Sequence, residues 1–368
     1  MEVAIIGAGL SGLSAALTLE RYGVQPTIFE KEDYVGYKFF NTEAMFSILN
    51  RPSKDCIESI KKEVGIKLEP IDIINKLIIF SKNERGSIEG GIGYSNIRGR
   101  IEKSYEKQLE KQLTSKILFN STEDYAYICK NFEKVILATG DGEYASRLGN
   151  FRSDLTCTIK GAIAKGSFHT DTAYVWFDYD LIPKGYGWLI PYSDKEANLV
   201  IAYPDYPNNI KLDLGHMWEE FCNVVQSTLN QSLKINEAFE ITRYMMGVSG
   251  KPKIDDTYFV GNCFGALLPG LGFGQFASII TGTYAAYDIC KVGVYEELVK
   301  PFYETYNHSL VLRRYLESLD NEKLDVAIKN LDNKFLDGII DKICSNNSGV
   351  DILKILTPLM RVGAMKNN

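Results

Sequence analysis

The sequence predicts a mixed α/β protein that combines a nucleotide-binding βαβ unit, an antiparallel sheet and a helical tail. Three observations lead to this prediction. The chain opens with an apolar run over residues 1–6, a glycine-rich turn and an apolar pattern at helical spacing. From residue 155 onwards, apolar runs of strand length are separated by turn residues, which is typical of an antiparallel sheet. Beyond residue 300 the sequence is charged and helical in character.

The first thirty residues carry the clearest motif. In a GxGxxG turn after a strand, the first glycine permits the tight turn, the second lets the backbone approach a pyrophosphate, and the third lets helix and strand pack closely. The N-terminus of the following helix offers N–H groups and a positive dipole end to the phosphates. An acidic residue about 20 positions further on accepts from ribose hydroxyls. The dinucleotide contacts expected from this motif are Gly7, Ala8, Gly9, Ser11, Gly12, Glu30 and Lys31.

Composition and charge argue against several classes of protein. The chain has 41 basic and 47 acidic residues, a net charge of −6, which argues against nucleic-acid binding. Its seven cysteines form no CxxC pair, and this favours reduced thiols in a cytoplasm over a disulfide framework. The three histidines lie far apart, so we expect no metal centre. No apolar run is long enough to span a bilayer.

The pattern between residues 31 and 150 indicates more of the nucleotide-binding unit and one inserted hairpin. A helix is expected over residues 55–64 and a hairpin over residues 71–94. A long charged helix over residues 101–113 follows Arg98, and a buried strand is expected at 135–139. Further on we expect strands at 155–167, 173–180, 187–191, 198–203 and 239–246, and helices at 214–229 and 275–290.

Three further stretches join the opening motif. Residues 135–142 (VILATGDG) are a buried strand that ends in an Asp-Gly pair. Residues 258–262 (YFVGN) and 268–274 (LPGLGFG) are a short strand, a Gly-Asn pair and a Pro/Gly loop that opens a helix. Together with Arg98, these stretches resemble the FAD-binding segments of flavoprotein hydroxylases and reductases with the para-hydroxybenzoate-hydroxylase fold. The resemblance implies FAD contacts at Arg98, Thr139, Gly140, Asp141, Gly261, Asn262, Gly272, Phe273 and Gly274.

The resemblance also implies how the chain is divided. We expect a Rossmann-like FAD-binding domain into which an antiparallel-sheet substrate domain is inserted, with a helical region at the C-terminal end. The expected FAD-binding domain is discontinuous and comprises residues 1–70, 95–150 and 253–295, the substrate-binding sheet comprises residues 71–94 and 151–252, and the helical region comprises residues 296–368.

Residues 183–191 (PKGYGWLIP) resemble the PxxYxWxFP motif of geranylgeranyl reductases, with Ile190 where that family has phenylalanine. Those flavoenzymes saturate double bonds of prenyl lipids, so the resemblance implies hydride transfer from reduced flavin to an isoprenoid or related apolar substrate. Tyr186 and Trp188 are two residues apart on a strand and therefore face the same side. That side is either the wall of a substrate tunnel or ordinary core. The substrate contacts implied are Tyr186, Trp188, Ile190, Pro269 and Gly270.

Two departures from the family keep other functions open. Asn262 replaces the usual aspartate, and residues 37–41 lack the cysteine that the family often has there. Residues 186–191 also resemble the WxWxIP motif of halogenases, so the alternative is an FAD-dependent monooxygenase or halogenase that uses O₂ on an aromatic substrate. Lys76 and Lys82 lie in the part of the chain where a halogenase has its catalytic lysine, but in no recognisable context. A flavin-binding protein without catalysis is the third reading.

The expected partners follow from these readings. The substrate is an apolar small molecule or a prenyl lipid, and the electron donor is NAD(P)H or ferredoxin. At the C-terminal end, Lys354, Arg361 and Lys366 alternate with apolar residues. This segment is either a packed helix or a helix that lies on a membrane surface, and the latter would make the cytoplasmic protein a peripheral membrane protein.

Overall fold

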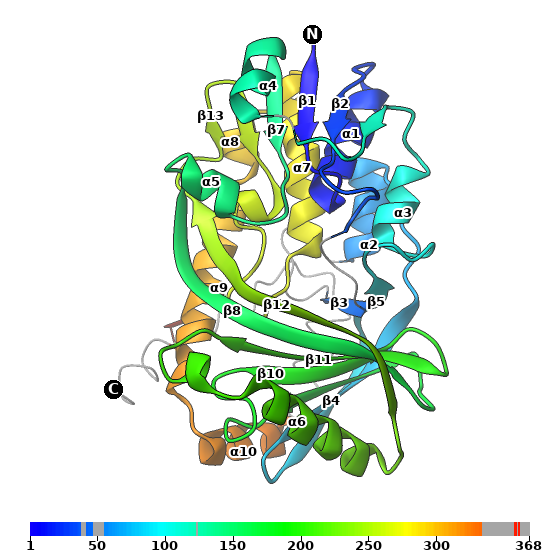
Figure 1. Cartoon of the computed structure of the whole chain (residues 1–368), viewed down its shortest axis with the longest axis vertical. Helices are drawn as coiled ribbons and strands as arrows, with labels where there is room; N and C mark the ends of the chain where they lie inside the picture. The colour runs from blue at the N-terminus through cyan, green and yellow to red at the C-terminus, as the bar shows by residue number, and fades with distance from the viewer. Residues whose placement is uncertain (38–41, 47–54, 123, 333–356, 359, 361–368) are drawn as a thin grey trace.

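Two β-sheets, one toward each end of the long axis, organise the molecule (Figure 1). The structure, a computed structural model, describes residues 1–37, 42–46, 55–122, 124–332, 357–358 and 360. Within these residues the first sheet has six strands and the second has eight. The mixed α/β fold that the sequence predicts is therefore confirmed.

The first sheet is the core of the nucleotide-binding unit. In spatial order its strands are β13 (Lys253–Ile254), β14 (Thr257–Phe259), β7 (Lys134–Leu137), β1 (Val3–Ile6), β2 (Thr27–Phe29) and β6 (Ile117–Leu118). All neighbours pair in parallel except β13 and β14. A parallel sheet is buried on both faces, and this explains the continuous apolar runs of its strands.

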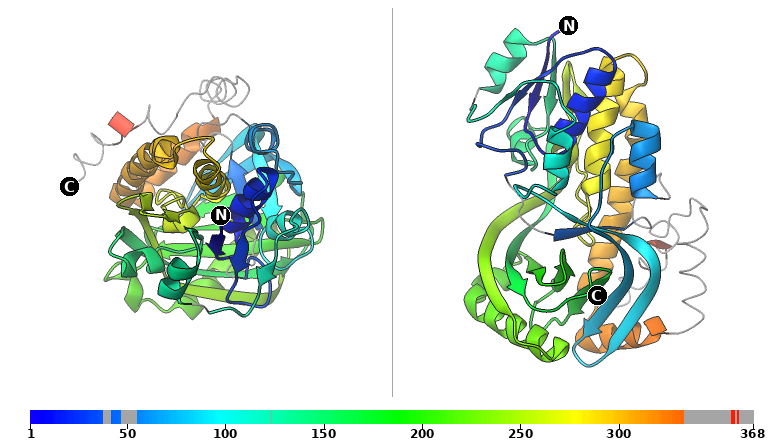
Figure 2. Two further views of the ribbon diagram at one scale, coloured as in Figure 1. Left: turned by 90° about the horizontal axis from the view of Figure 1, so that it is seen from above. Right: turned by 90° about the vertical axis from the view of Figure 1, so that its right-hand side faces the viewer.

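Helices cover both faces of this sheet. Ile5 of β1 packs with residues of α1 (Leu10–Arg21) and α7 (Gln275–Ile289), and Figure 2 shows these two helices side by side. Ala4 points the other way and packs with Ile128 of α4 (Tyr125–Asn131). The two helices whose N-termini were expected to face a cofactor, α1 and α7, therefore share one side of the sheet.

The second sheet is antiparallel apart from one parallel pair, β4 with β9. Helix α6 (Leu214–Leu229) covers the face of this sheet that points away from the first sheet, and its Phe221 packs with Leu189 and Trp176 (Figure 1). In spatial order the strands are β12 (Lys234–Ser249), β8 (Phe151–Lys165), β11 (Glu196–Pro204), β10 (Tyr186–Pro191), β9 (Thr172–Phe177), β4 (Asp72–Ser81), β5 (Arg85–Ile97) and β3 (Thr42–Phe46).

Short elements and the C-terminal helices complete the fold. Helix α9 (Lys300–Ser318) runs from beside the first sheet down to the second sheet, and α10 (Asn321–Lys329) then packs against the β4–β5 hairpin (Figure 1). No helix in the described part of the chain is long and apolar enough to cross a membrane. The remaining elements are α2 (Cys56–Ser59), which continues as a π-helix (Ile60–Val64), α3 (Tyr105–Glu110), α5 (Glu143–Arg147), α8 (Tyr295–Leu298), α9 (Lys300–Ser318), α10 (Asn321–Lys329) and 3₁₀ turns at Asn209–Lys211, Gly261–Cys263 and Asn330–Asp332.

Two sequence-based expectations differ from the structure. Strand β3 lies within residues 1–70, which were expected to belong to the FAD-binding domain, but it pairs with β5 at the edge of the second sheet. The charged helix expected over residues 101–113 begins only at Tyr105, because Ser104 caps it by accepting from the Lys107 N–H. The helical character expected after residue 300 holds through Lys329, whereas residues 333–356 and the basic end at Lys354, Arg361 and Lys366 lie outside the described residues.

Candidate cofactor site and substrate cavity

The glycine turn after β1 has the packing that a dinucleotide site requires. Gly7 has a positive φ of 107°, and a Cβ there would lie 2.3 Å from the Ala138 carbonyl oxygen. A Cβ on Gly12 would lie 2.0 Å from the Gly7 carbonyl oxygen. A Cβ on Gly9, by contrast, would meet nothing within 4 Å. The outer two glycines are thus needed for packing, while the middle one borders open space where a pyrophosphate can approach.

The first turn of α1 faces this open space without a side-chain cap. Gly9 is its N-cap, and no described side chain accepts from its first N–H groups. Glu30 is 7% exposed, and its two carboxylate oxygens accept from the Ala8 and Glu32 N–H groups at 2.7 and 3.1 Å. Glu30 therefore fixes the turn, while Lys31 points outward and pairs with Glu32. Uncapped N–H groups at a helix N-terminus are an anion-binding feature.

The ends of β7 and β14 meet beside this turn. Asn262 Nδ2 donates to the Gly140 carbonyl at 3.1 Å and to the Tyr244 hydroxyl oxygen at 2.7 Å. The Tyr244 hydroxyl in turn donates to the same Gly140 carbonyl at 2.9 Å. Burial raises the pKa of Tyr244 well above its usual range, so the phenol remains a neutral donor. This triangle joins the two expected FAD-binding segments and ties β12 of the second sheet to them.

Cys263 forms a second link at the same place. Its thiol lies 2.9 Å from the Thr139 hydroxyl and donates to the Asp141 carbonyl at 3.0 Å. Thr139, Gly140 and Asp141, which were expected to contact FAD, therefore lie directly against the Gly261–Cys263 turn. The structure brings together two motifs that are more than a hundred residues apart in the sequence.

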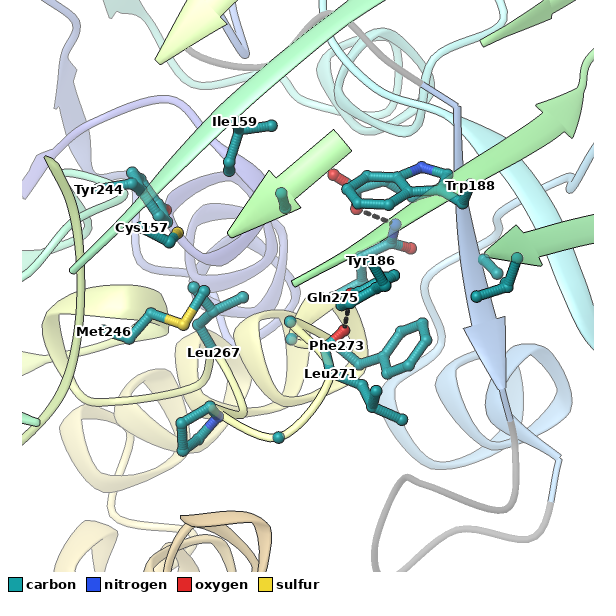
Figure 3. A pocket seen from close by; sticks show the side chains of 18 of the residues that line it. Cys157, Ile159, Tyr186, Trp188, Tyr244, Met246, Leu267, Leu271, Phe273 and Gln275 are labelled. Atoms are coloured by element: carbon teal, nitrogen blue, oxygen red, sulfur yellow. Dashed lines mark hydrogen bonds between the residues drawn. The ribbon is translucent and has the colours of Figure 1, made fainter. Parts of the chain in front are cut away.

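A cavity of about 180 Å³ lies between the second sheet and the loop that precedes α7 (Figure 3). A single buried water needs roughly 10–15 Å³ on this measure, so the cavity is large enough for an organic group. At one end it reaches Asn262 and Gly272, which belong to the expected cofactor site, and Ser278 of α7. Most of the wall is apolar and includes Phe46, Leu77, Ile159, Val175, Ile190, Met246, Leu267, Pro269, Gly270, Leu271 and Phe273.

Tyr186 and Trp188 line this cavity, as does Ile190. Leu189, which lies between Trp188 and Ile190, points to the opposite face, toward α6. The Tyr186 and Trp188 rings are 5.3 Å apart, and the Tyr186 hydroxyl donates to the Leu271 carbonyl at 2.6 Å (Figure 3). The sequence did not decide whether Tyr186 and Trp188 face a cavity or ordinary core, and in the structure they face the cavity. Burial raises the pKa of Tyr186 well above its usual range, so this donor is also neutral.

Arg98 and two carboxylates form a buried charged cluster at the end of the cavity nearest the expected cofactor site. Arg98 Nε pairs with Glu106 at 2.7 Å, and Arg98 Nη1 pairs with Glu43 at 3.0 Å. Burial lowers the pKa of Arg98, but the two facing carboxylates outweigh burial and the net direction is upward. Arg98, expected to contact FAD, is therefore held by two carboxylates and lines the cavity from there.

Gln275, the first residue of α7, completes this group. Its Nε2 donates to the Glu43 carboxylate. Its Oε1 is buried and has no hydrogen-bond partner among the described groups. The α7 N-terminus also has no side-chain cap in the described part of the chain. An acceptor without a partner and uncapped N–H groups at one cavity end suit a polar ring edge with both donors and acceptors.

Four residues of this site were missed by the sequence reasoning. Glu43 lies on β3, a five-residue strand for which no element was predicted, and the apolar run at 44–46 that follows it was the available signal. Gln275 and Tyr244 lie in elements that were expected, but their directions depend on packing. Arg313 of α9 also lines the cavity. Its only sequence signal was its place in a helix that was expected to be charged.

The two lysines considered for halogenase chemistry lie elsewhere. Lys76 pairs with Glu89 at 2.6 Å, and Lys82 pairs with Asp180. Both side chains are more than a third exposed, at 38% and 46%. Neither lines the cavity, and no other lysine does so among the described residues.

Comparison with known proteins supports the nucleotide-binding unit. Residues 5–49 match the model of the NAD(P)-binding Rossmann-like domain. A flavin-containing amine oxidase of Oncorhynchus mykiss is 30% identical over 96 residues, which are 24% of this chain and 18% of that protein. The 4,4'-diapolycopen-4-al dehydrogenase of Metabacillus indicus is 34% identical over 80 residues, 20% of this chain and 16% of that protein. The chain thus matches less than a fifth of the length of either relative.

Solved structures match over the whole chain. A geranylgeranyl bacteriochlorophyll reductase-like protein of Thermoplasma acidophilum aligns over 98% of each chain, with a TM-score of 0.71 and 13% identity. A flavin-dependent brominase aligns over 100% of each chain, with a TM-score of 0.66 and 13% identity. At these identities the likeness concerns the fold. The chain has the fold of the FAD-dependent oxidoreductases, a class that includes this reductase-like protein and the halogenases, and the expected family resemblance is confirmed at that level.

Proposed function

We propose that the protein is an FAD-dependent oxidoreductase that reduces carbon–carbon double bonds of an isoprenoid or a related apolar substrate. One observation carries this proposal: a single apolar cavity extends from the expected cofactor site at Asn262 and Gln275 along Tyr186, Trp188 and Ile190 of β10. An apolar molecule in this cavity would lie against the place where a flavin ring would be held.

The residues present fit FAD. The Gly7–Gly12 turn and the N-terminus of α1 would hold the pyrophosphate, and Glu30, whose carboxylate accepts from the Ala8 N–H of this turn, would also accept from the ribose. Asn262, Gln275 and the uncapped N-terminus of α7 would hold the ribityl chain and the ring edge. Bound FAD would supply hydride chemistry, and the electron donor for it is NAD(P)H or ferredoxin.

The protein's own part is to bind, orient and shield the substrate. The Phe46 and Phe273 rings are 5.2 Å apart across the cavity wall, and Trp188 and Ile190 belong to the same apolar cluster. Burying apolar surface contributes roughly 25 cal/mol per Å², so such a wall favours a hydrocarbon chain over a polar substrate. The charged groups at its cofactor end are already paired with one another.

The relatives bear on this proposal in different ways. The match to the 4,4'-diapolycopen-4-al dehydrogenase covers only 20% of this chain and bears on nucleotide binding. The reductase-like structure supports the substrate proposal through its fold and its name. The brominase shares the same fold, so oxygen-dependent chemistry on an aromatic substrate is the alternative outcome of the test. Without a lysine in the described cavity wall, the geometry favours reduction.

Oxygen dependence separates the two chemistries. The protein would be reconstituted with FAD, reduced anaerobically with dithionite, NADH, NADPH or reduced ferredoxin, and mixed with geranylgeraniol. We expect flavin reoxidation without O₂ and a product heavier by two hydrogens for each bond reduced, as measured by mass spectrometry. A protein that leaves geranylgeraniol unchanged, and that forms an oxygenated or halogenated aromatic product only with O₂, would contradict the proposal.

A further inference from the structure

The cavity wall contains a cation that the proposed chemistry does not use. Among the described residues that line the cavity, three are charged: Glu43, Arg98 and Arg313. Arg98 lies between two carboxylates, as described above. Arg313 is on α9 and only 5% exposed, and it stands apart from that pair. Arg313 pairs with Glu317 through Nε at 2.7 Å, and a buried ion pair is favourable only where the remaining donors of the guanidinium are also satisfied.

Neighbouring contacts place Arg313 beside the cofactor-facing loop. The Gly270 N–H donates to the Ser309 hydroxyl at 2.9 Å, and Ser309 is one helical turn before Arg313 on α9. Arg313 Nη2 donates to the carbonyl of Lys184, two residues before Tyr186. Arg313 therefore lies at the Tyr186 end of the cavity, while the apolar wall continues past Trp188 to Ile190.

One of the three guanidinium nitrogens is available to a ligand. Nε donates to Glu317 at 2.7 Å, and Nη2 is taken by the Lys184 carbonyl. Nη1 makes no hydrogen bond to any described group, and it is not fully buried. Since Arg313 lines the cavity, Nη1 is the donor that it can offer there.

The contacts around Arg313 also leave an excess of positive charge. Arg314 Nη1 pairs with the same Glu317 carboxylate at 2.9 Å, and the Tyr206 hydroxyl donates to it as well. Within this network two guanidinium groups share one carboxylate. One negative charge in the cavity would restore neutrality, and a charge-assisted hydrogen bond to Nη1 would hold it.

We infer that Arg313 binds a carboxylate at one end of the substrate, so that the substrate is an apolar molecule with an acidic terminus. This inference rests on the proposed function for its apolar part only. A carboxylate matches the single excess charge, whereas a phosphate at neutral pH carries more charge than the network lacks. The apolar remainder of the molecule would extend from Arg313 along Trp188 toward Ile190.

Binding of matched pairs of probes tests this assignment without any turnover. Calorimetry on the purified full-length chain would compare farnesoic acid with farnesol, and 2-naphthoic acid with 2-naphthol. We expect the acid of at least one pair to bind about ten- to a hundredfold more tightly than its alcohol. Arg313→Met should remove this preference and leave alcohol binding unchanged. Arg313→Lys should keep part of it, because the charge remains.

Arg314→Met is the matched control. It changes the neighbouring arginine, which shares Glu317 but does not line the cavity, so it removes the excess charge and keeps the Nη1 donor; it should therefore weaken the acid preference less than Arg313→Met does. An acid preference that survives Arg313→Met, equal affinity for acid and alcohol in the wild-type protein, or no binding of either acid would overturn the inference. Tighter binding of farnesyl phosphate than of farnesoic acid would overturn the choice of carboxylate. A preference seen only with the naphthalene pair would leave Arg313 in its role and contradict the isoprenoid proposal instead.

Discussion

Asn262 is where the structure predicts the opposite of what family resemblance suggests. The resembled flavoproteins have aspartate at this position, so Asn262→Asp looks conservative. Here, however, Asn262 Nδ2 is a donor to both the Gly140 carbonyl and the Tyr244 hydroxyl oxygen. An aspartate would turn an acceptor toward the Gly140 carbonyl. We therefore expect Asn262→Asp to weaken FAD binding and to lower the melting temperature.

The size of this effect follows from the hydrogen bonds that a carboxylate at this position would remove. Tyr244 can redirect its proton to the new carboxylate, but the Gly140 carbonyl is then left without either of its present donors, Asn262 and Tyr244. An unsatisfied acceptor costs about 1–3 kcal/mol when fully buried, which corresponds to roughly 5- to 150-fold in an equilibrium constant. Gly140 is half-buried, so we expect the weakening of FAD binding to lie in the lower part of this range. Flavin fluorescence titration and thermal melts of the protein without FAD would measure the two effects separately.

A double-mutant cycle with Tyr244→Phe identifies the cause. If the triangle of Asn262, Tyr244 and Gly140 is the unit, the two substitutions should be strongly non-additive, with a coupling of about 0.5–3 kcal/mol. Additive effects would show that the residues act independently. An Asn262→Asp protein with unchanged melting temperature and equal or tighter FAD binding would refute the reasoning from these hydrogen bonds.

Five further substitutions test other parts of the protein. Gly9→Val should abolish FAD binding, measured by flavin content, at nearly unchanged melting temperature, because a Cβ there meets open space. Gly282→Ala should lower stability by about 1–3 kcal/mol in denaturant titrations, since its Cβ would lie 2.1 Å from a backbone oxygen of α1. Trp188→Ala should lower kcat/KM for a long substrate by about ten- to a hundredfold, whereas Trp176→Ala, under α6, should instead cost ~3–5 kcal/mol of stability. Asp288→Asn should lower the melting temperature at neutral pH and flatten the decline of the melting temperature in acid. Burial raises the pKa of Asp288, but hydrogen bonds and a lysine outweigh burial, and the net direction is downward. The Asp288 carboxylate therefore stabilises the fold above the ordinary carboxyl pKa, and this stabilisation is lost as the pH falls through the lowered pKa.

The cofactor cradle was predictable because its determinants are local. Gly7 needs a positive φ and Gly12 needs close packing, and both requirements are visible as glycines at fixed spacing. The direction in which Tyr186 and Trp188 of β10 point was predictable only in part. The spacing of Tyr186 and Trp188 showed that they share a face, but the choice between the cavity and α6 depends on where Phe221 packs.

Glu43 and Arg313 could not be predicted from the sequence for a related reason. Glu43 meets Arg98 because β3 joins the edge of a sheet whose other strands come from elsewhere in the chain. Arg313 reaches the cavity because α9 packs beside the Gly270 loop. Neither strand pairing across the chain nor helix docking leaves a periodic trace, so the residues they position look like ordinary surface charges in the sequence.

The relation between α1 and α7 explains how one site can hold a long dinucleotide and an apolar substrate together. Gly282 of α7 packs against Ser11 in the first turn of α1, and only a glycine permits that approach. Gly282 is seven residues after Gln275, so the two helix N-termini are offset by about 10 Å along α7 at 1.5 Å per residue. One N-terminus faces the open space beside Gly9 and the other faces the cavity. An extended cofactor with phosphates at the first and a ring at the second spans such an offset, and its ring would then form one wall of the cavity that Tyr186 and Trp188 line from the opposite side.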